Sequence, residues 1–450
     1  MSEVPTPCSP QAAAEVLASS CGDSLQFPQE LVDWIIDNHV SDDVRLLKTC
    51  SLISWAWVPR CRSYLFKKLP DLIPQNILVL GELLRSPHCT FLSHVRSISA
   101  FRYTWYLNDR YFNQVVADLP RLTNVHILEI PLTTVNTTDP DAAEHASSHT
   151  GFVTAGVPTV MHRVFTAFPH VTRLKLNCFL EPTMVIDLIC LLPALKELWL
   201  HSGYNLDMRR RGMVPVVADP PLNAVPPRGL HCLALSGDAV GFILAWLNAT
   251  EHLPNVSSVA LSSDIEYADV PILQAALQQL GEHEALHHLD ITLYSSLGYG
   301  ALTMFDFSKH LNLRTLAICD VRWVGPYDLE VEQMLKLITK LAAPTLECFT
   351  LDVDLLLYQT LDWSVLDSFL CRARFPRLQS VKIEDRYPRV RTRSDTDIDY
   401  HAEQHKFLPG VLPLLEAAGL LQTYTPQIVR RISPLSTRGA NRNTVQVPQL

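Results

Sequence analysis

Two histidines and a glutamate near the middle of the chain have the spacing of a zinc-binding signature, His-Glu-x-x-His. They are His283, Glu284 and His287. On a helix, residues four apart lie on one face, so the two imidazoles could bind one zinc ion while the carboxylate acts as a general base. In an extended segment His283 and His287 lie roughly 13 Å apart, at about 3.3 Å per residue, and cannot share an ion. Whether the stretch is helix or strand therefore decides its chemistry.

The other candidates for chemistry lack residues that the chemistry needs. Asp395, Asp397 and Asp399 are spaced like the ligands of a calcium loop, but Tyr400 stands where a glycine makes the turn and Lys406 where a bidentate glutamate belongs. No glycine-rich phosphate loop, no Gly-x-Ser-x-Gly motif and no Cys-x-x-Cys pair occurs in the sequence. We therefore expect no metal, no cofactor and no enzymatic activity, and a hydrolase with an unrecognised site is the alternative.

Composition and charge narrow the class of protein further. Of the 450 residues, 48% are hydrophobic and 18% are charged, which is typical of a folded chain. The net charge of −9 disfavours nucleic acid as a partner, and no apolar run reaches the roughly 20 residues that span a membrane. The N-terminus lacks the pattern of a secretory signal, and the eleven cysteines have no paired spacing. We expect a cytoplasmic protein, a nuclear protein, or one found in both compartments, with reduced thiols.

A repeated apolar pattern, Leu-x-x-Leu-x-Leu with any apolar residue at the three fixed positions, runs through most of the chain. Successive copies begin 24 to 49 residues apart, mostly near 30. The last three residues of each copy alternate apolar, variable and apolar, which is the period of a half-buried strand. The copies begin at Val95, Leu122, Val171, Leu195, Leu230, Val256, Leu286, Leu313, Leu346 and Leu378.

Helix-like stretches separate these predicted strands. Their apolar residues recur at spacings of three and four, which is typical of a helix with one buried face. Asp238 and Asp362 stand where helix N-caps are expected. The stretches are 183–192, 238–250, 269–280, 329–341 and 362–373.

The repeat decides how the zinc-like signature is interpreted. Leu286, Leu289 and Ile291 occupy the three fixed positions of the seventh copy. Gly281 stands where the preceding helix should end. The segment from His283 to His287 is therefore predicted to be a turn that runs into a strand, which excludes a shared zinc ion.

A strand plus a helix every 24 to 35 residues resembles a leucine-rich repeat over residues 92–384. The resemblance implies an α/β fold, namely a curved solenoid with a parallel sheet on the concave face and helices outside. One feature departs from the family, because the asparagine that usually follows the last apolar strand position is missing. Phe179, Gly203, Tyr294 and Val321 stand at those positions, so we expect irregular repeats.

The N-terminal residues 25–70 predict a module of three short helices. Leu31 and Ile35, with Val32 and Ile36 beside them, make the apolar stripe of the first helix. Ser41 or Asp42 can cap the second helix, and the third can open at Pro59. A module of this size buries only a small core and is near the limit of stability without a neighbour or a partner.

The same residues resemble an F-box. Phe27 and Pro28 match the family's opening Leu-Pro, the apolar first helix matches its first helix, and the stretch TCSLISWAWVPRCRSYLF (49–66) is similar to F-box-like proteins of mushroom-forming fungi. The resemblance implies a substrate-recognition adaptor that docks a Skp-type protein and thereby a cullin ubiquitin ligase. It assigns an exposed docking surface to Phe27, Pro28, Leu31, Val32, Ile35, Leu46, Leu47, Cys50 and Trp57. The alternative is a non-catalytic interaction scaffold whose helical module recruits no ligase.

The repeats would then hold an unidentified target protein on their concave face. The variable positions beside the apolar strand residues should point into that face. Trp199 is the strongest candidate for a binding hot spot, unless its ring packs under the loop 201–228. The predicted target-binding residues are Arg173, Lys175, Glu197, Trp199, His288, Asp290, Ser380 and Lys382.

The predicted organisation of the chain follows from these elements. Residues 25–70 form the F-box-like module and 92–384 the solenoid. The remaining segments are a disordered N-terminus (1–24), a linker helix (71–91), a polar linker (385–404), a C-terminal capping helix (405–424) and a disordered tail (425–450).

Overall fold

The computed structural model of the protein describes most of the module and of the repeats. The described residues are 28–72, 74–100, 110–131, 159–178, 182–202, 223–237, 239–263, 270–293, 305–320, 331–355, 357–385 and 407–423. Phe27, Asp238, the predicted disordered ends, the calcium-like aspartates and all of the polar linker except Asp385 lie outside these segments.

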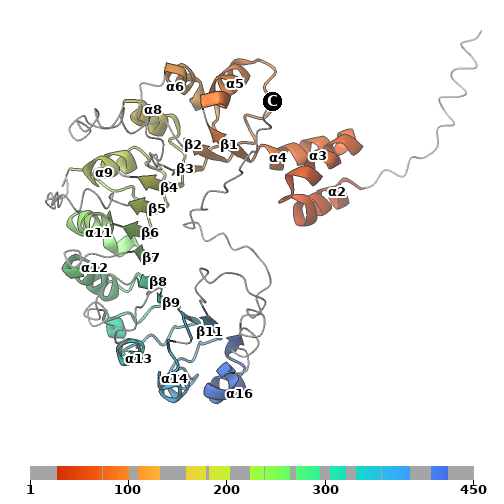
Figure 1. Cartoon of the computed structure of the whole chain (residues 1–450). Coiled ribbons are helices and arrows are strands. Elements are labelled where there is room, and N and C mark those ends of the chain that lie inside the picture. Colours follow the sequence, from red (N-terminus) through yellow and green to blue (C-terminus); the bar gives the residue numbers. More distant parts are fainter. Residues whose placement is uncertain are drawn as a thin grey trace, which may run out of the picture.

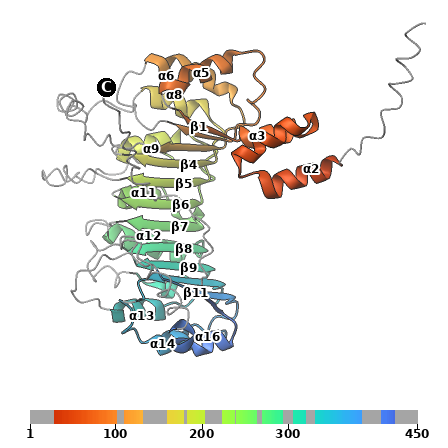
Figure 2. The ribbon, with the colours of Figure 1, turned by 45° about the vertical axis from the view of Figure 1, so that its right-hand side comes forward.

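A single parallel sheet runs through the described segments, with its strands in chain order from β1 to β12. Figure 1 shows the strands along the inside of an arc and the helices along its outside, and Figure 2 shows the strands stacked one above the next. The strands are β1 (Lys68–Leu72), β2 (Ser97–Ala100), β3 (Ile127–Pro131), β4 (Arg173–Cys178), β5 (Glu197–Ser202), β6 (Cys232–Gly237), β7 (Ser258–Ser263), β8 (His288–Leu293), β9 (Thr315–Asp320), β10 (Cys348–Val353), β11 (Ser380–Asp385) and β12 (Leu421–Thr423).

Helices return the chain from one strand to the next along the outside of the arc. They are α5 (Pro74–Arg85), α6 (Arg110–Val115), α8 (Thr159–Ala167), α9 (Pro182–Cys190), α11 (Ala239–Ala249), α12 (Val270–Glu282), α13 (Val331–Thr339), α14 (Trp363–Phe369) and α16 (Pro413–Ala417). Short 3-10 turns complete three repeats, at η3 (Val116–Arg121), η4 (Leu253–Asn255) and η6 (Phe307–Lys309). Asp362 caps α14 as predicted, accepting hydrogen bonds from the backbone N–H groups of Ser364 and Val365.

The fixed leucines of the repeat form the core between sheet and helices. In-register pairing stacks Leu174, Leu198 and Leu233 on neighbouring strands, and all three are fully buried in one continuous apolar cluster. Each buried side chain of this size contributes about 1.5–3 kcal/mol. The predicted leucine-rich-repeat solenoid, with its parallel concave sheet and outer helices, is therefore confirmed.

The sheet is longer than the repeat pattern predicts, because β1 and β12 lie outside residues 92–384. In β1 the spacing of the repeat is broken, since Leu69 is followed by Pro70 and Asp71, and Leu72 pairs with Ala100 after a register shift. A proline fits there because β1 is an edge strand, where a missing backbone N–H leaves no neighbour unpaired. The predicted linker helix is α5, and it belongs to the solenoid, since Ile77 and Leu84 are buried in the same core.

The second copy of the pattern lies three residues later than the sequence suggests. β3 pairs Leu128 with Leu174 and Ile130 with Leu176, so the copy begins at Val125 rather than at Leu122. Both starting points satisfy the apolar pattern, because Leu122 and Val125 are three residues apart and both are buried. The shift moves Glu129 to a position on the concave face.

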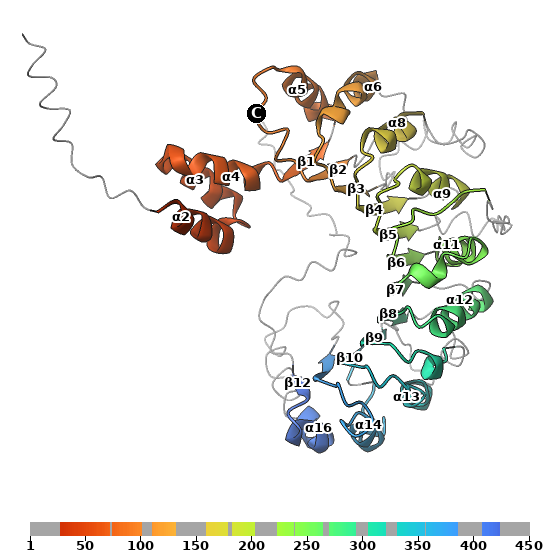
Figure 3. The same cartoon turned by 180° about the vertical axis from the view of Figure 1, so that it is seen from behind.

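The N-terminal module forms a small separate core. It consists of α2 (Gln29–Ile35), the π-helix η1 (Ile36–Val40), α3 (Val44–Ile53), the 3-10 turn η2 (Trp55–Trp57) and α4 (Val58–Leu65). Asp43 caps α3 rather than Ser41 or Asp42. Only Phe66 and Lys67 separate α4 from β1, and the module projects from the N-terminal end of the arc (Figure 3).

Candidate interaction surfaces

The zinc-like signature lies in a turn, as the repeat predicts. Helix α12 ends at Glu282, and β8 begins at His288. Glu284 has a positive φ of 53°, and its backbone carbonyl accepts a hydrogen bond from the Asn312 amide at 3.0 Å. The helical face that the signature requires is therefore absent at His283 and His287. Among the described residues, no group of three His, Cys, Asp or Glu side chains lies close enough to hold a metal ion.

The concave face carries two cross-strand ion networks at its N-terminal end. Arg173 on β4 makes two hydrogen bonds to Glu197 on β5, from Nε to Oε2 at 2.5 Å and from Nη2 to Oε1 at 2.9 Å. The hydrogen bond from Arg173 lowers the pKa of Glu197, and the same contact raises the pKa of Arg173. The pair is a third exposed, so it orders the surface more than it stabilises the fold.

The second network centres on Glu129, which the repeat alignment from Leu122 places off the concave face. Lys68 Nζ lies 2.7 Å from one carboxylate oxygen of Glu129, and Lys175 Nζ lies 3.0 Å from the other. Although burial acts to raise the pKa of Glu129, hydrogen bonds from the two lysines hold it below its usual value. Three strands that lie apart in the sequence, β1, β3 and β4, are joined by this one carboxylate.

Trp199 lies directly beside these networks. The Lys175 ammonium is 5.2 Å from the centre of the indole ring, which is within the range of a cation–π contact. The indole Nε1 is buried and has no hydrogen-bond partner of ordinary geometry in the described segments, although its proximity helps to lower the pKa of Glu197. Lys175 therefore covers the ring, and residues 203–222 of the loop that could also cover it lie outside the description.

The middle of the concave face is lined by small side chains. Cys232 and Ala234 on β6 lie beside Ser258 and Ala260 on β7. Burial raises the pKa of the Cys232 thiol, which keeps it protonated. One strand back, His201 Nδ1 lies 2.6 Å from the buried hydroxyl of Ser236. Small side chains on β6 and β7 therefore lie between the ion networks and the C-terminal strands.

The remaining predicted target-binding residues lie on β8 and β11. His288 Nδ1 is 2.9 Å from the Thr315 hydroxyl, and burial lowers the pKa of His288. Lys382 forms an ion pair with Glu384 on its own strand. The eight predicted residues thus share strand positions that face away from the helices, but they form three groups along the arc rather than one site. Lys68, Glu129, His201 and Glu384 are among the polar residues of this face that the sequence analysis missed.

The module surface differs from the predicted docking surface. Val32, Leu47 and Cys50 are buried together with Ile36, Val40 and Cys61, so these predicted contact residues form the module's own core. Ile35 and Trp57 are half-buried against that core, whereas Pro28, Leu31 and Leu46 are exposed. The exposed large apolar residues of the module are Leu31, Trp34, Val44, Leu46, Leu52, Ile53 and Trp55.

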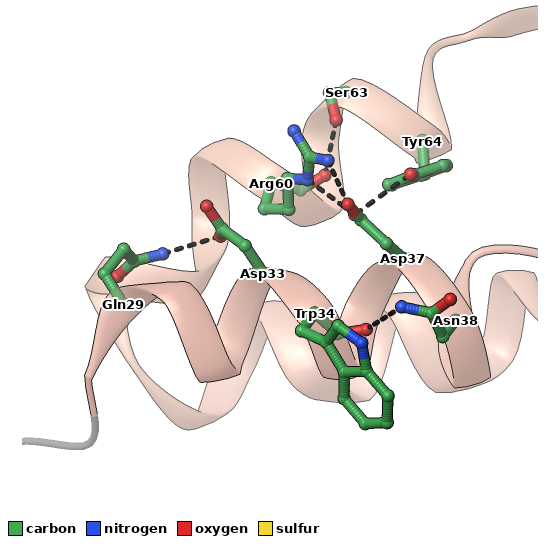
Figure 4. A network of polar contacts seen from close by, with 8 residues as sticks. All are labelled: Gln29, Asp33, Trp34, Asp37, Asn38, Arg60, Ser63 and Tyr64. Carbon is green, nitrogen blue, oxygen red and sulfur yellow. Dashed lines mark hydrogen bonds and ion pairs between the residues drawn. The ribbon is translucent and has the colours of Figure 1, made fainter.

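A polar network fixes the first helices of the module against the third (Figure 4). Asp37 in η1 accepts a hydrogen bond from Arg60 Nε at 2.7 Å and another from the Tyr64 hydroxyl at 3.0 Å. The bond from Arg60 lowers the pKa of Asp37, and the pKa of Arg60 is raised in turn. Trp34 points away from this network and accepts a hydrogen bond at its backbone carbonyl from Asn38.

Comparison with known proteins adds little to this description. No protein family model matches the chain, and no curated protein matches it. Among solved structures, the leucine-rich repeat-containing protein LegL7 from Legionella pneumophila is similar, with 16% identity and a TM-score of 0.38, over 71% of this chain and 90% of that chain. So weak a likeness does not bear on function. None of the described helices is long and apolar enough to cross a lipid bilayer.

Proposed function

We propose that the protein is a substrate-recognition adaptor of a ubiquitin ligase. In this proposal the F-box-like module docks a Skp-type protein, which connects to a cullin, and the concave face of the solenoid holds a target protein. The chemistry of ubiquitin transfer belongs to the ligase. The chain contributes two binding surfaces, joined by the two residues between α4 and β1.

The exposed apolar surface of the module is the observation that carries the proposal. Leu52 and Trp55 are 86% and 88% exposed, and five further large apolar residues of the module are between 42% and 63% exposed. Soluble domains rarely leave so many large apolar side chains in water unless the patch binds another protein. Trp and Leu side chains of this kind gain about 1.5–3 kcal/mol each when a partner buries them.

The binding of a recombinant Skp-type protein to the full chain tests this function. We expect association, measured by calorimetry, and a loss of at least tenfold in affinity for Leu31→Asp, since a buried charge without a partner is costly. Leu311→Asp is the matched control, because Leu311 on the solenoid is 44% exposed, close to the 49% of Leu31. Equal weakening by both variants, or no association of the unaltered chain, contradicts the proposal.

A scaffold that recruits no ligase is the second candidate, and one observation favours it. The module completes its own core with Val32, Leu47 and Cys61 and continues into β1 after two residues. It can therefore fold as part of this chain without a Skp-type partner. A chain that binds its target but no Skp-type protein would identify this function.

A further inference from the structure

The outward side of α3 combines two cations with an apolar tip. Arg45, Lys48 and Leu52 are three and four residues apart, so they lie on one side of the helix, opposite the buried Leu47 and Cys50. Both cations are exposed, and neither makes an ion pair with any described residue. Ile53, the last residue of α3 and 63% exposed, and Trp55, which follows the helix, extend the apolar tip. We call these five residues, Arg45, Lys48, Leu52, Ile53 and Trp55, the α3 surface.

The module separates its charges along the chain, which makes the α3 surface locally positive. Its acids are Glu30, Asp33, Asp37, Asp42 and Asp43, on the first helices and in the turn before α3. Its bases all follow that turn, at Arg45, Lys48, Arg60, Arg62 and Lys67. Asp37 already pairs with Arg60, and Asp43 is occupied as the cap of α3. Among the described residues, none of these acids forms an ion pair with Arg45 or Lys48.

We propose that the α3 surface docks an acidic segment of a partner protein that also presents apolar side chains, such as an amphipathic helix with a glutamate-rich flank. Charge complementarity selects this partner, because two unpaired cations beside apolar contacts favour carboxylates at the same spacing. The inference rests on the proposed function in one respect, that the module docks another protein. It goes further in naming the face that is used and the chemistry that it recognises.

An anionic membrane is the other surface that cations and an exposed tryptophan can bind, and the charges disfavour it. Electrostatic binding to anionic lipids takes clusters of about four to eight basic residues, whereas the α3 surface has two. Glu30 and Asp33 on α2 flank the exposed Leu31 and Trp34, so the neighbouring apolar helix would be repelled by the same lipids. A protein segment can match both signs, whereas a uniform anionic surface cannot.

Two synthetic helical peptides test the inference on the full chain. They share a leucine face and differ only in their polar flank, which is glutamate-rich in one and lysine-rich in the other. We expect fluorescence anisotropy to show the acidic peptide binding at least about tenfold more tightly, with an affinity that falls as salt is added. The double variant Arg45→Glu with Lys48→Glu should remove or reverse this preference. Trp55→Ala should weaken the acidic peptide about thirtyfold, as loss of a central aromatic contact does.

The controls separate this inference from the proposed function. Arg163→Glu with Lys340→Glu makes the same charge change on exposed solenoid residues and should leave the preference intact. Equal binding of both peptides, an unchanged preference in the α3 double variant, or binding to phosphatidylserine vesicles in place of the acidic peptide overturns the inference. If a Skp-type protein binds the unaltered chain but the acidic and basic peptides bind equally, the inference fails while the proposed function stands. If the acidic peptide behaves as expected and no Skp-type protein binds, the proposed function fails while the inference stands.

Discussion

The buried carboxylate of Asp367 on α14 accepts a hydrogen bond from the backbone N–H of Leu415 at 2.9 Å, across 48 residues of sequence. Its second oxygen accepts another from the N–H of Leu414, also at 2.9 Å. These are backbone groups in the first turn of α16 that have no partner within the helix. One aspartate therefore holds α16 against the last full repeat and provides hydrogen-bond acceptors for two N–H groups at the start of that helix.

Replacement of Asp367 should loosen the C-terminal end of the solenoid. We expect Asp367→Ala to lower the free energy of unfolding by about 2–4 kcal/mol, because two hydrogen bonds to a charged group are lost and two backbone donors stay unpaired. Urea denaturation measures the loss, and hydrogen exchange should show it first in residues 413–423. Glu332→Gln is the control, since the Glu332 side chain is 88% exposed. A variant as stable as the unaltered chain would show that α16 does not depend on this contact.

The stability of the protein should fall in mild acid because of His310. Burial lowers the pKa of this histidine, although Asp306 acts in the opposite direction, and its buried Nδ1 has no hydrogen-bond partner among the described residues. The unfolded chain therefore binds a proton at a higher pH than the folded chain does. Stability contributed by the neutral ring is complete above the unfolded pKa of about 6.5 and declines as the pH falls below it.

The measurement is urea denaturation at steps between pH 7.5 and pH 5. We expect a shallower loss of stability in His310→Asn than in the unaltered chain, whereas His283→Asn, at an exposed position, should keep the full loss. His201 and His288 also have pKa values lowered by burial, so some pH dependence should persist in every variant. Identical pH profiles for all three proteins would refute the role of His310.

Gly81 should tolerate no side chain, because α5 and α6 approach closely there. A Cβ at Gly81 would lie 2.7 Å from Cγ2 of the buried Val115. We expect Gly81→Ala to destabilise the protein by about 1–3 kcal/mol, since overpacking outweighs the gain of up to about 1 kcal/mol in helix propensity. Gly410→Ala is a matched control, as Gly410 lies in the helical residues 407–411 and an added Cβ would meet no described residue within 4 Å. Thermal unfolding should show opposite shifts for the two variants.

Glu251 should be replaceable by glycine with a gain in stability. Its φ of 54° lies in the left-handed region, where a residue with a Cβ is strained by about 1–2 kcal/mol. Glu251→Gly should therefore raise the midpoint of denaturation. The greater conformational freedom of glycine in the unfolded chain offsets a small part of this gain. Glu284 has the same conformation, but its carboxylate also accepts a hydrogen bond from Asn312 at 3.1 Å, so Glu284→Gly should gain less. A loss of stability at both positions would show that the strain is negligible.

The sequence predicts the solenoid well because its signal is repeated. The leucines at Leu174, Leu198 and Leu233 each mark a strand that is buried on one side, and the neighbouring copies reinforce the interpretation. The signal fails where a copy is ambiguous or incomplete. Leu122 and Val125 both fit the pattern, so the register of β3 can be set only by its pairing with β4. In β1 the third apolar residue, Leu72, comes one position late, and in β12 Thr423 stands at that position, so the place of both strands in the sheet depends on their neighbours.

Surface and core are harder to tell apart in the module. Val32 and Leu31 are adjacent apolar residues, yet the first is buried and the second half exposed. A small helical module has few core positions, and an apolar residue on its flank looks the same in the sequence as one in its core. Only the packing of α2 against α3 and α4 separates the two classes. The exposure of Leu52 and Trp55 is therefore shown by the structure and could not be predicted from the apolar pattern of the sequence.

The two-residue connection between α4 and β1 determines how the module is oriented relative to the solenoid. The Lys67 carbonyl accepts backbone hydrogen bonds from Arg96 and Ser97 at 2.9 and 3.0 Å. The connection is therefore hydrogen-bonded to the start of β2, one residue before β1 begins. A target protein on the concave face and a partner bound to the module would then keep a nearly constant orientation relative to each other. Lengthening the connection with a few glycines would keep both binding surfaces in one chain but remove their fixed relative orientation, so it would show which of the two properties matters.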